Sequence, residues 1–145
     1  MNFIMVYWSR YGHNKQIVDH LKDKLENKGH SAQVLKTDET DPKLLPAADV
    51  YVFSAAAEAF RIQKEMRHFI KNIDGLQGKK CAIINTHGMK KRNWLKSMDK
   101  MVSKKNMEKI AEIDFIIGEG QEKGEGLSDD WQSHLDGFIE TLQNP

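Results

Sequence analysis

Apolar residues follow two patterns along the chain: short continuous runs and a helical spacing. Runs rich in apolar and β-branched residues predict five strands, at 3–8, 31–36, 50–54, 81–85 and 113–117. After each of these strands except the second, apolar residues recur at three- and four-residue spacing. This spacing predicts helices whose apolar faces cover 17–25, 62–73, 94–102 and 128–142, the last with Ser128 as its N-cap.

Strands that alternate with helices indicate an α/β fold with right-handed crossovers. Nearly unbroken apolar strands are typical of a parallel sheet that helices cover on both faces. Five strands are too few for an eight-fold barrel, so we expect one open, doubly wound domain over residues 1–145. Ligands of such sheets lie beyond the carboxyl ends of the strands, which here points to loops 9–14, 54–61 and 85–93.

Composition and charge narrow the classes of function. With 39% hydrophobic and 30% charged residues, the chain is typical of a soluble globular protein, and no apolar run is long enough to span a membrane. The start lacks a signal peptide, and the lone Cys81, expected to be an inert buried thiol, suits a reducing compartment, so we expect a cytoplasmic protein. Neither a nucleic-acid module nor a metal-ligand spacing is present.

The loop after the first strand carries the strongest functional signal. Ser9 and Asn14 can each offer a side-chain hydrogen bond to a phosphate oxygen, and Gly12 lets the backbone approach a ligand closely. The free N–H groups that open the following helix favour an anion there. An alternative is a plain turn in which Asn14 caps the helix. The candidate phosphate-binding residues are Ser9, Arg10, Tyr11, Gly12, His13 and Asn14.

This segment resembles the phosphate-loop signature of the flavodoxin family. The family pattern has an aliphatic and an aromatic residue, then Ser or Thr, a small residue and Thr; here Val6, Tyr7, Ser9 and Gly12 match, and Asn14 stands in place of Thr. The resemblance implies a flavodoxin-like three-layer α/β/α sandwich whose five parallel strands have the order 2-1-3-4-5. It also implies FMN as the cofactor.

In the family, the loops after strands three and four hold the flavin ring. Phe60 is the candidate ring-stacking residue, although it could instead be a hydrophobic staple of the next helix. His87 could contact the flavin or be an ordinary loop histidine, and we expect Trp94 to pack in the core rather than cover the ring. The remaining candidates in these loops are Ala55, Ala56, Ala57, Thr86 and Gly88.

Charge near the ring suggests how the flavin would be tuned. Residues 79–109 hold ten basic and two acidic residues, among them Lys90, Lys91 and Arg92 next to the expected ring edge. Positive charge there would stabilise reduced flavin, although the charges could equally be a solvated face. Glycines and acids in 118–126 are typical of a mobile solvated loop.

Three functions follow from the resemblance. The first is an FMN-binding electron-transfer protein that docks redox partner proteins. The second is a flavin-dependent oxidoreductase whose basic loop attracts a quinone or an anionic substrate such as protoporphyrinogen. The third is a flavin-free binding module with the same fold.

Overall fold

The computed structural model describes residues 1–58, 61–88 and 93–145. Five strands form a parallel sheet in the order β2-β1-β3-β5-β6: β1 (Asn2–Tyr7), β2 (Ser31–Lys36), β3 (Val50–Glu58), β5 (Lys80–His87) and β6 (Glu108–Ile116). Numbered along the chain without the short β4, this is the predicted order 2-1-3-4-5. The predicted fold class is therefore confirmed.

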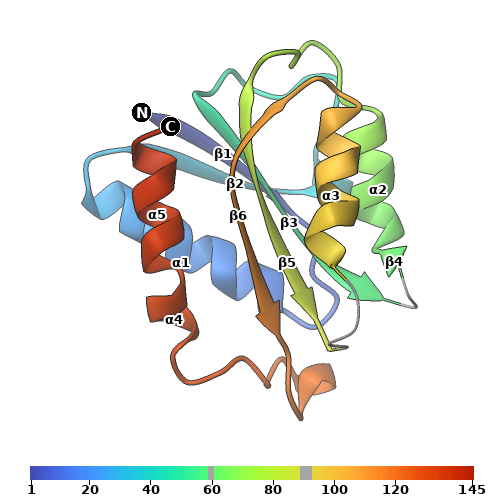
Figure 1. Cartoon of the computed structure of the whole chain (residues 1–145), viewed down its shortest axis with the longest axis vertical. Coiled ribbons are helices and arrows are strands. Elements are labelled where there is room, and N and C mark those ends of the chain that lie inside the picture. Colours follow the sequence, from blue (N-terminus) through green and yellow to red (C-terminus); the bar gives the residue numbers. More distant parts are fainter. Residues whose placement is uncertain (59–60, 89–92) are drawn as a thin grey trace.

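Two helical layers cover the sheet (Figure 1). Helices α1 (His13–Asn27), α4 (Trp131–His134) and α5 (Asp136–Gln143) lie on one face, and α2 (Lys64–Lys71) and α3 (Trp94–Ser103) lie on the other. Two 3-10 turns, η1 (Thr37–Glu39) and η2 (Gln121–Lys123), follow β2 and β6.

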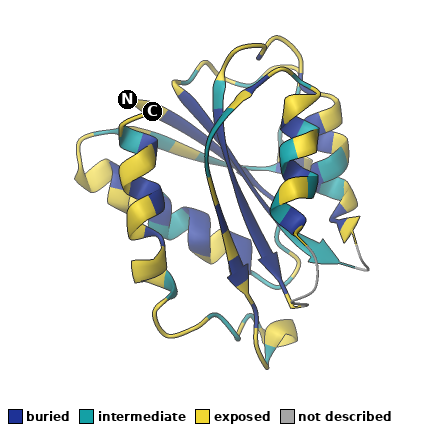
Figure 2. Ribbon diagram, in the orientation of Figure 1, coloured by how far each residue is buried: buried dark blue, intermediate teal, exposed yellow. Residues whose placement is uncertain are grey.

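The central strands β1, β3 and β5 are largely buried from both sides, the edge strands β2 and β6 are partly exposed, and the helices are buried only along one face (Figure 2). Alternate strand residues point into opposite cores, so Met5 packs under α1 and α5, whereas its neighbour Val6 packs under α2 and α3. Trp94 is 5% exposed within the α2–α3 core, which confirms its predicted packing role. Cys81 is fully buried there, and burial raises the pKa of its thiol to about 12.

Several element boundaries differ from the sequence-based prediction; β6, for example, begins at Glu108 rather than at residue 113. β3 and β5 run beyond their apolar segments to Glu58 and His87, because backbone pairing continues between Ala56 and Thr86. A two-residue strand, β4 (Arg61–Ile62), pairs antiparallel with the end of β3. These extensions carry side chains to the carboxyl edge of the sheet.

The last helix also departs from the prediction. It divides at Leu135 into α4 and α5, and its N-cap is Asp130 rather than Ser128. The predicted Ser128 cap is wrong because the Ser128 hydroxyl donates a hydrogen bond to Asp130 Oδ1 at 2.8 Å. The hydroxyl therefore bonds within the turn that precedes the helix.

Candidate functional site

Loops from four strands meet at the carboxyl edge of the sheet. They enclose a narrow cavity of about 30 Å³, which has room for about one water molecule. The lining residues are Tyr11, His13, Ala56, Ala57, Glu58, Thr86, His87, Gly88, Ile117 and Gln121. Seven of them are residues that the sequence singled out. Of the other three, Glu58 lies within the predicted ligand loop 54–61 but was not itself a candidate, and Ile117 and Gln121 reach the cavity through the fold.

Loop 9–14 has the backbone that an anion site needs. Gly12 is the N-cap of α1 at a φ of 96°, a left-handed conformation that glycine adopts without steric cost. The first turn of α1 carries no acidic residue, so its free N–H groups and the helix dipole present positive potential.

Two polar side-chain atoms beside this loop are buried without a partner. Among the described residues, neither the Ser9 hydroxyl nor the Trp8 indole N–H forms a hydrogen bond. Buried polar groups are normally paired, and an unpaired one costs about 1–3 kcal/mol. Both groups therefore have an unused donor, and the contact of Ser9 with phosphate stays a prediction.

Asn14 has a different environment from the one expected of a phosphate ligand. Its side chain is 2% exposed; its Oδ1 accepts a hydrogen bond from Ser54 Oγ at 2.8 Å, and its Nδ2 donates to Thr86 Oγ1 at 3.1 Å. This bridge ties the start of α1 to the ends of β3 and β5. The amide retains one further N–H, so its predicted contact with phosphate stays a prediction.

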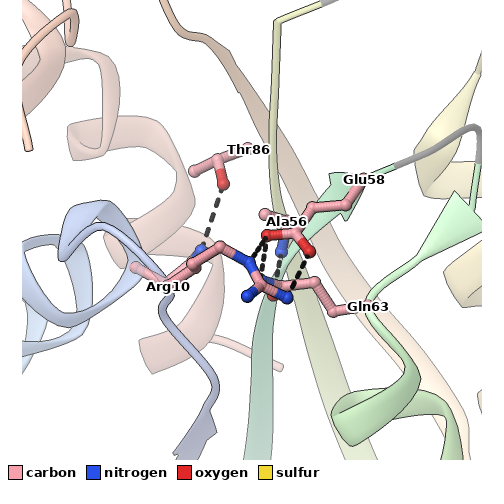
Figure 3. Close-up of polar contacts among 6 residues, drawn as sticks. Arg10, Ala56, Glu58, Gln63 and Thr86 are labelled. Carbon is pink, nitrogen blue, oxygen red and sulfur yellow. Dashed lines mark hydrogen bonds and ion pairs between the residues drawn. The ribbon is translucent and has the colours of Figure 1, made fainter. Parts of the chain in front are cut away.

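Arg10 connects the same loop to the end of β3 (Figure 3). Its Nε and Nη2 donate to the two carboxylate oxygens of Glu58 at 2.7 and 2.9 Å. Gln63 donates to Glu58 Oε1 at 2.9 Å and accepts from the Ala56 backbone N–H at 2.9 Å. Burial alone would raise the pKa of Glu58, but the hydrogen bonds from Arg10 and Gln63 and the charge of Arg10 outweigh it, so this pKa lies below its ordinary value.

His87 stands at the end of β5, on the side of the cavity that faces β6. Its side chain is 5% exposed, and its Nε2 lies 2.8 Å from Asp114 Oδ2 on β6. His134 Nε2 lies 3.2 Å from the Asp114 carbonyl oxygen. The contact with Asp114 on β6 therefore fixes the orientation of the His87 imidazole.

Loop 118–126 contacts the start of α1 through hydrogen bonds to its backbone. A backbone hydrogen bond from Gly118 to Gly126 closes it at 2.8 Å. His13 Nε2 lies 2.6 Å from the Glu125 carbonyl oxygen, and Gln16 Nε2 donates to the Gly124 carbonyl oxygen at 3.2 Å. Polar side chains from the start of α1 therefore contact the backbone of this largely exposed loop, and its mobility stays a prediction.

Sequence comparison places the chain in a family. The sequence model described as Flavodoxin domain matches residues 4–124, which is most of the chain. The protein belongs to the flavodoxin family. No curated protein matches this flavodoxin-family chain significantly in sequence.

Solved flavodoxins share the fold. The two-electron reduced flavodoxin of Megasphaera elsdenii has a TM-score of 0.77 at 13% identity, with 99% of each chain covered. Oxidised flavodoxin 2 from Bacillus cereus has a TM-score of 0.77 at 15% identity, also with 99% of each chain covered. Rubredoxin oxygen:oxidoreductase from Desulfovibrio gigas has a TM-score of 0.72 at 10% identity, over 99% of this chain and 36% of that one.

Membership of the family implies a flavin cofactor, and the residues at loop 9–14 fit a flavin phosphate. They combine a free helix N-terminus, a left-handed glycine and the buried, unpartnered hydroxyl of Ser9. The ring region is described less fully, since Phe60, Lys90, Lys91 and Arg92 lie outside the described residues. Ala55, by contrast, is buried in the α2–α3 core and does not line the cavity.

The described residues include neither a metal-ligand cluster nor a membrane-spanning helix. No group of three or more His, Cys, Asp or Glu side chains there could hold a metal ion. None of the described helices has the length and apolar character needed to cross a membrane.

Proposed function

We propose that this protein binds FMN and carries electrons between redox partner proteins, in the cytoplasm. The observation that carries the proposal is the architecture of loop 9–14. Its helix N-terminus, the φ of Gly12 and the unpartnered Ser9 hydroxyl favour a phosphate dianion.

The residues of this chain would divide the work of binding. Backbone N–H groups at the start of α1 and the Ser9 hydroxyl would bind the phosphate. Asn14, held by Ser54 and Thr86, would keep these donors in position. FMN would supply the redox chemistry, and nearby charges of the protein would set its potential.

The ring would lie at the mouth of the cavity between the ends of β3 and β5. A cavity of about 30 Å³ is too small to enclose a tricyclic ring, so the ring would lie at its mouth rather than inside it. Ala56, Ala57, Thr86, His87 and Gly88 would then flank the ring. The short, small side chains of Ala56 and Ala57 leave room for it.

A fluorescence titration tests the proposal. Addition of apoprotein to FMN should quench flavin fluorescence with near-stoichiometric binding, whereas riboflavin, which lacks the phosphate, should bind far more weakly. Ser9→Ala should weaken FMN binding by about tenfold, because one charge-assisted hydrogen bond is lost. Ser133→Ala removes the hydroxyl of an exposed serine on α4, which bonds the Asp130 carbonyl oxygen, and should leave the affinity for FMN unchanged.

Equal affinity for FMN and riboflavin would contradict the phosphate assignment, and absence of binding would favour the flavin-free module. Turnover separates the two flavin-dependent functions. A carrier should exchange electrons with a redox protein and show no turnover with small substrates, whereas catalytic oxidation of a porphyrinogen or reduction of a quinone by the holoprotein alone would favour the oxidoreductase.

A further inference from the structure

Three side chains join loop 9–14 to the end of β3, and we call them the clasp: Arg10, Glu58 and Gln63. The guanidinium of Arg10 makes two hydrogen bonds to the Glu58 carboxylate at 2.7 and 2.9 Å, across 48 positions of sequence. Paired bonds of this kind fix the orientation of both groups as well as their separation. Figure 3 shows the two planar groups facing each other at the carboxyl edge of the sheet.

Gln63 fixes the Glu58 carboxylate to the backbone of β3. It is 2% exposed, donates to Glu58 Oε1 at 2.9 Å, and bonds the Ala56 backbone through both its side-chain oxygen and its own N–H, at 2.9 and 3.0 Å. Glu58 is therefore held by donors from two sides and is 27% exposed, whereas the Arg10 side chain is 48% exposed. The negative charge is the more deeply placed member of the pair.

The position of the Glu58 carboxylate at the cavity indicates a role for its charge. Glu58 lines the same cavity as Thr86 and His87, which is the end of the site where the ring would lie. A fixed carboxylate there opposes the added negative charge of a reduced ligand, and a cation bonded to that carboxylate cancels much of the opposition. The two partners of this salt bridge therefore act on the reduction potential in opposite directions.

We propose that the clasp is a positioning and charge-compensating device that sets the reduction potential of the bound flavin. The proposal rests on the proposed function. It assigns opposite roles to two residues that touch each other: Glu58 lowers the potential, and Arg10 restores it. Neither residue needs to contact the phosphate for this to hold.

Measurement of the two-electron potential of FMN holoprotein tests the assignment. Glu58→Gln should raise the potential and Arg10→Gln should lower it, each by a roughly threefold or larger change in the equilibrium between oxidised and reduced flavin at low salt. The double variant should return close to the parent. Because both charges are partly exposed, 0.5 M salt should shrink the two single shifts.

Matched controls come from a second ion pair on α1, in which Lys22 Nζ lies 2.6 Å from Glu26 Oε1. Lys22→Gln and Glu26→Gln remove the same charges at a site remote from the cavity and should leave the potential unchanged. Arg10→Lys and Glu58→Asp keep the charges and should remain closer to the parent than the glutamine variants do.

Shifts of the same sign in both single variants would overturn the proposal, because loosened loops rather than charge would then be responsible. Unchanged potentials, or shifts that the α1 controls reproduce, would overturn it as well. These results would leave the proposed function intact as long as the parent binds FMN. Failure of the parent to bind FMN would instead overturn both.

Discussion

Replacement of Asn14 by alanine removes the bridge between α1 and two strands. The amide makes two hydrogen bonds, with Ser54 Oγ at 2.8 Å and Thr86 Oγ1 at 3.1 Å. Ser54 and Thr86 are 0% and 1% exposed, so both hydroxyls lose a buried hydrogen-bond partner when this side chain is removed. Each buried group left unsatisfied costs about 1–3 kcal/mol.

We therefore predict that Asn14→Ala lowers the free energy of unfolding by about 2–4 kcal/mol. With a urea m-value of roughly 2 kcal/mol/M for a domain of this size, the midpoint should fall by about 1–2 M. Urea titrations followed by far-UV circular dichroism measure this shift, in apoprotein and without flavin.

Two further variants make the result specific. Lys15→Ala alters the next residue of α1, whose 2.6 Å ion pair with Asp19 is exposed, and should change stability by less than about 0.5 kcal/mol. Ser54→Ala should cost less in the Asn14→Ala background than in the parent, because its partner is already gone. A loss below about 0.5 kcal/mol for Asn14→Ala would refute the reasoning that this bridge stabilises the fold.

Three other predictions concern groups outside the clasp and the Asn14 bridge. Cys81, whose pKa burial raises to about 12, should not react with a thiol reagent at pH 8 until the protein unfolds; fast labelling of native protein would contradict this. Gly124→Ala should lower the free energy of unfolding by about 1–2 kcal/mol or more, because φ is 75° and a Cβ would lie 2.8 Å from the Tyr11 carbonyl oxygen. Gly137→Ala, in open space on α5, should instead raise the free energy of unfolding by about 0.5–1 kcal/mol. Equal effects of the two variants in thermal melts would refute this reasoning. Burial and the charge of Lys24 lower the pKa of His20, so folding stability should fall as the pH drops below the ordinary histidine value, and His20→Phe should flatten that fall between pH 7 and 5.

The central strands β1, β3 and β5 could be predicted from the sequence because they are buried on both faces over most of their length and there consist of nearly continuous apolar residues. The ends of β3 and β5 could not, since Ala56 to Glu58 and Thr86 to His87 have no apolar signal of their own. Pairing with each other extends these strands. The side chains that line the cavity from them depend on that pairing.

Part of the site could be predicted for a different reason. The phosphate site proposed at loop 9–14 depends largely on its backbone and on one glycine, and both can be inferred from the sequence order of a strand, a turn and a helix. The partners of Arg10, His13 and Asn14 lie 48, 112 and 40 positions away. No local pattern encodes such contacts, so the pairing of Arg10 with Glu58 and the place of loop 118–126 at the site became visible only with the fold.

The central claim is that loop 9–14 binds the phosphate of FMN. Two-dimensional ¹H–¹⁵N spectra of the protein, recorded during separate titrations with FMN, riboflavin and inorganic phosphate, test it most directly. We predict that FMN shifts the amide signals of residues 9–14, that phosphate shifts the same signals at higher concentration, and that riboflavin leaves them nearly unchanged. Amides of residues 9–14 that do not respond to bound FMN would contradict the account.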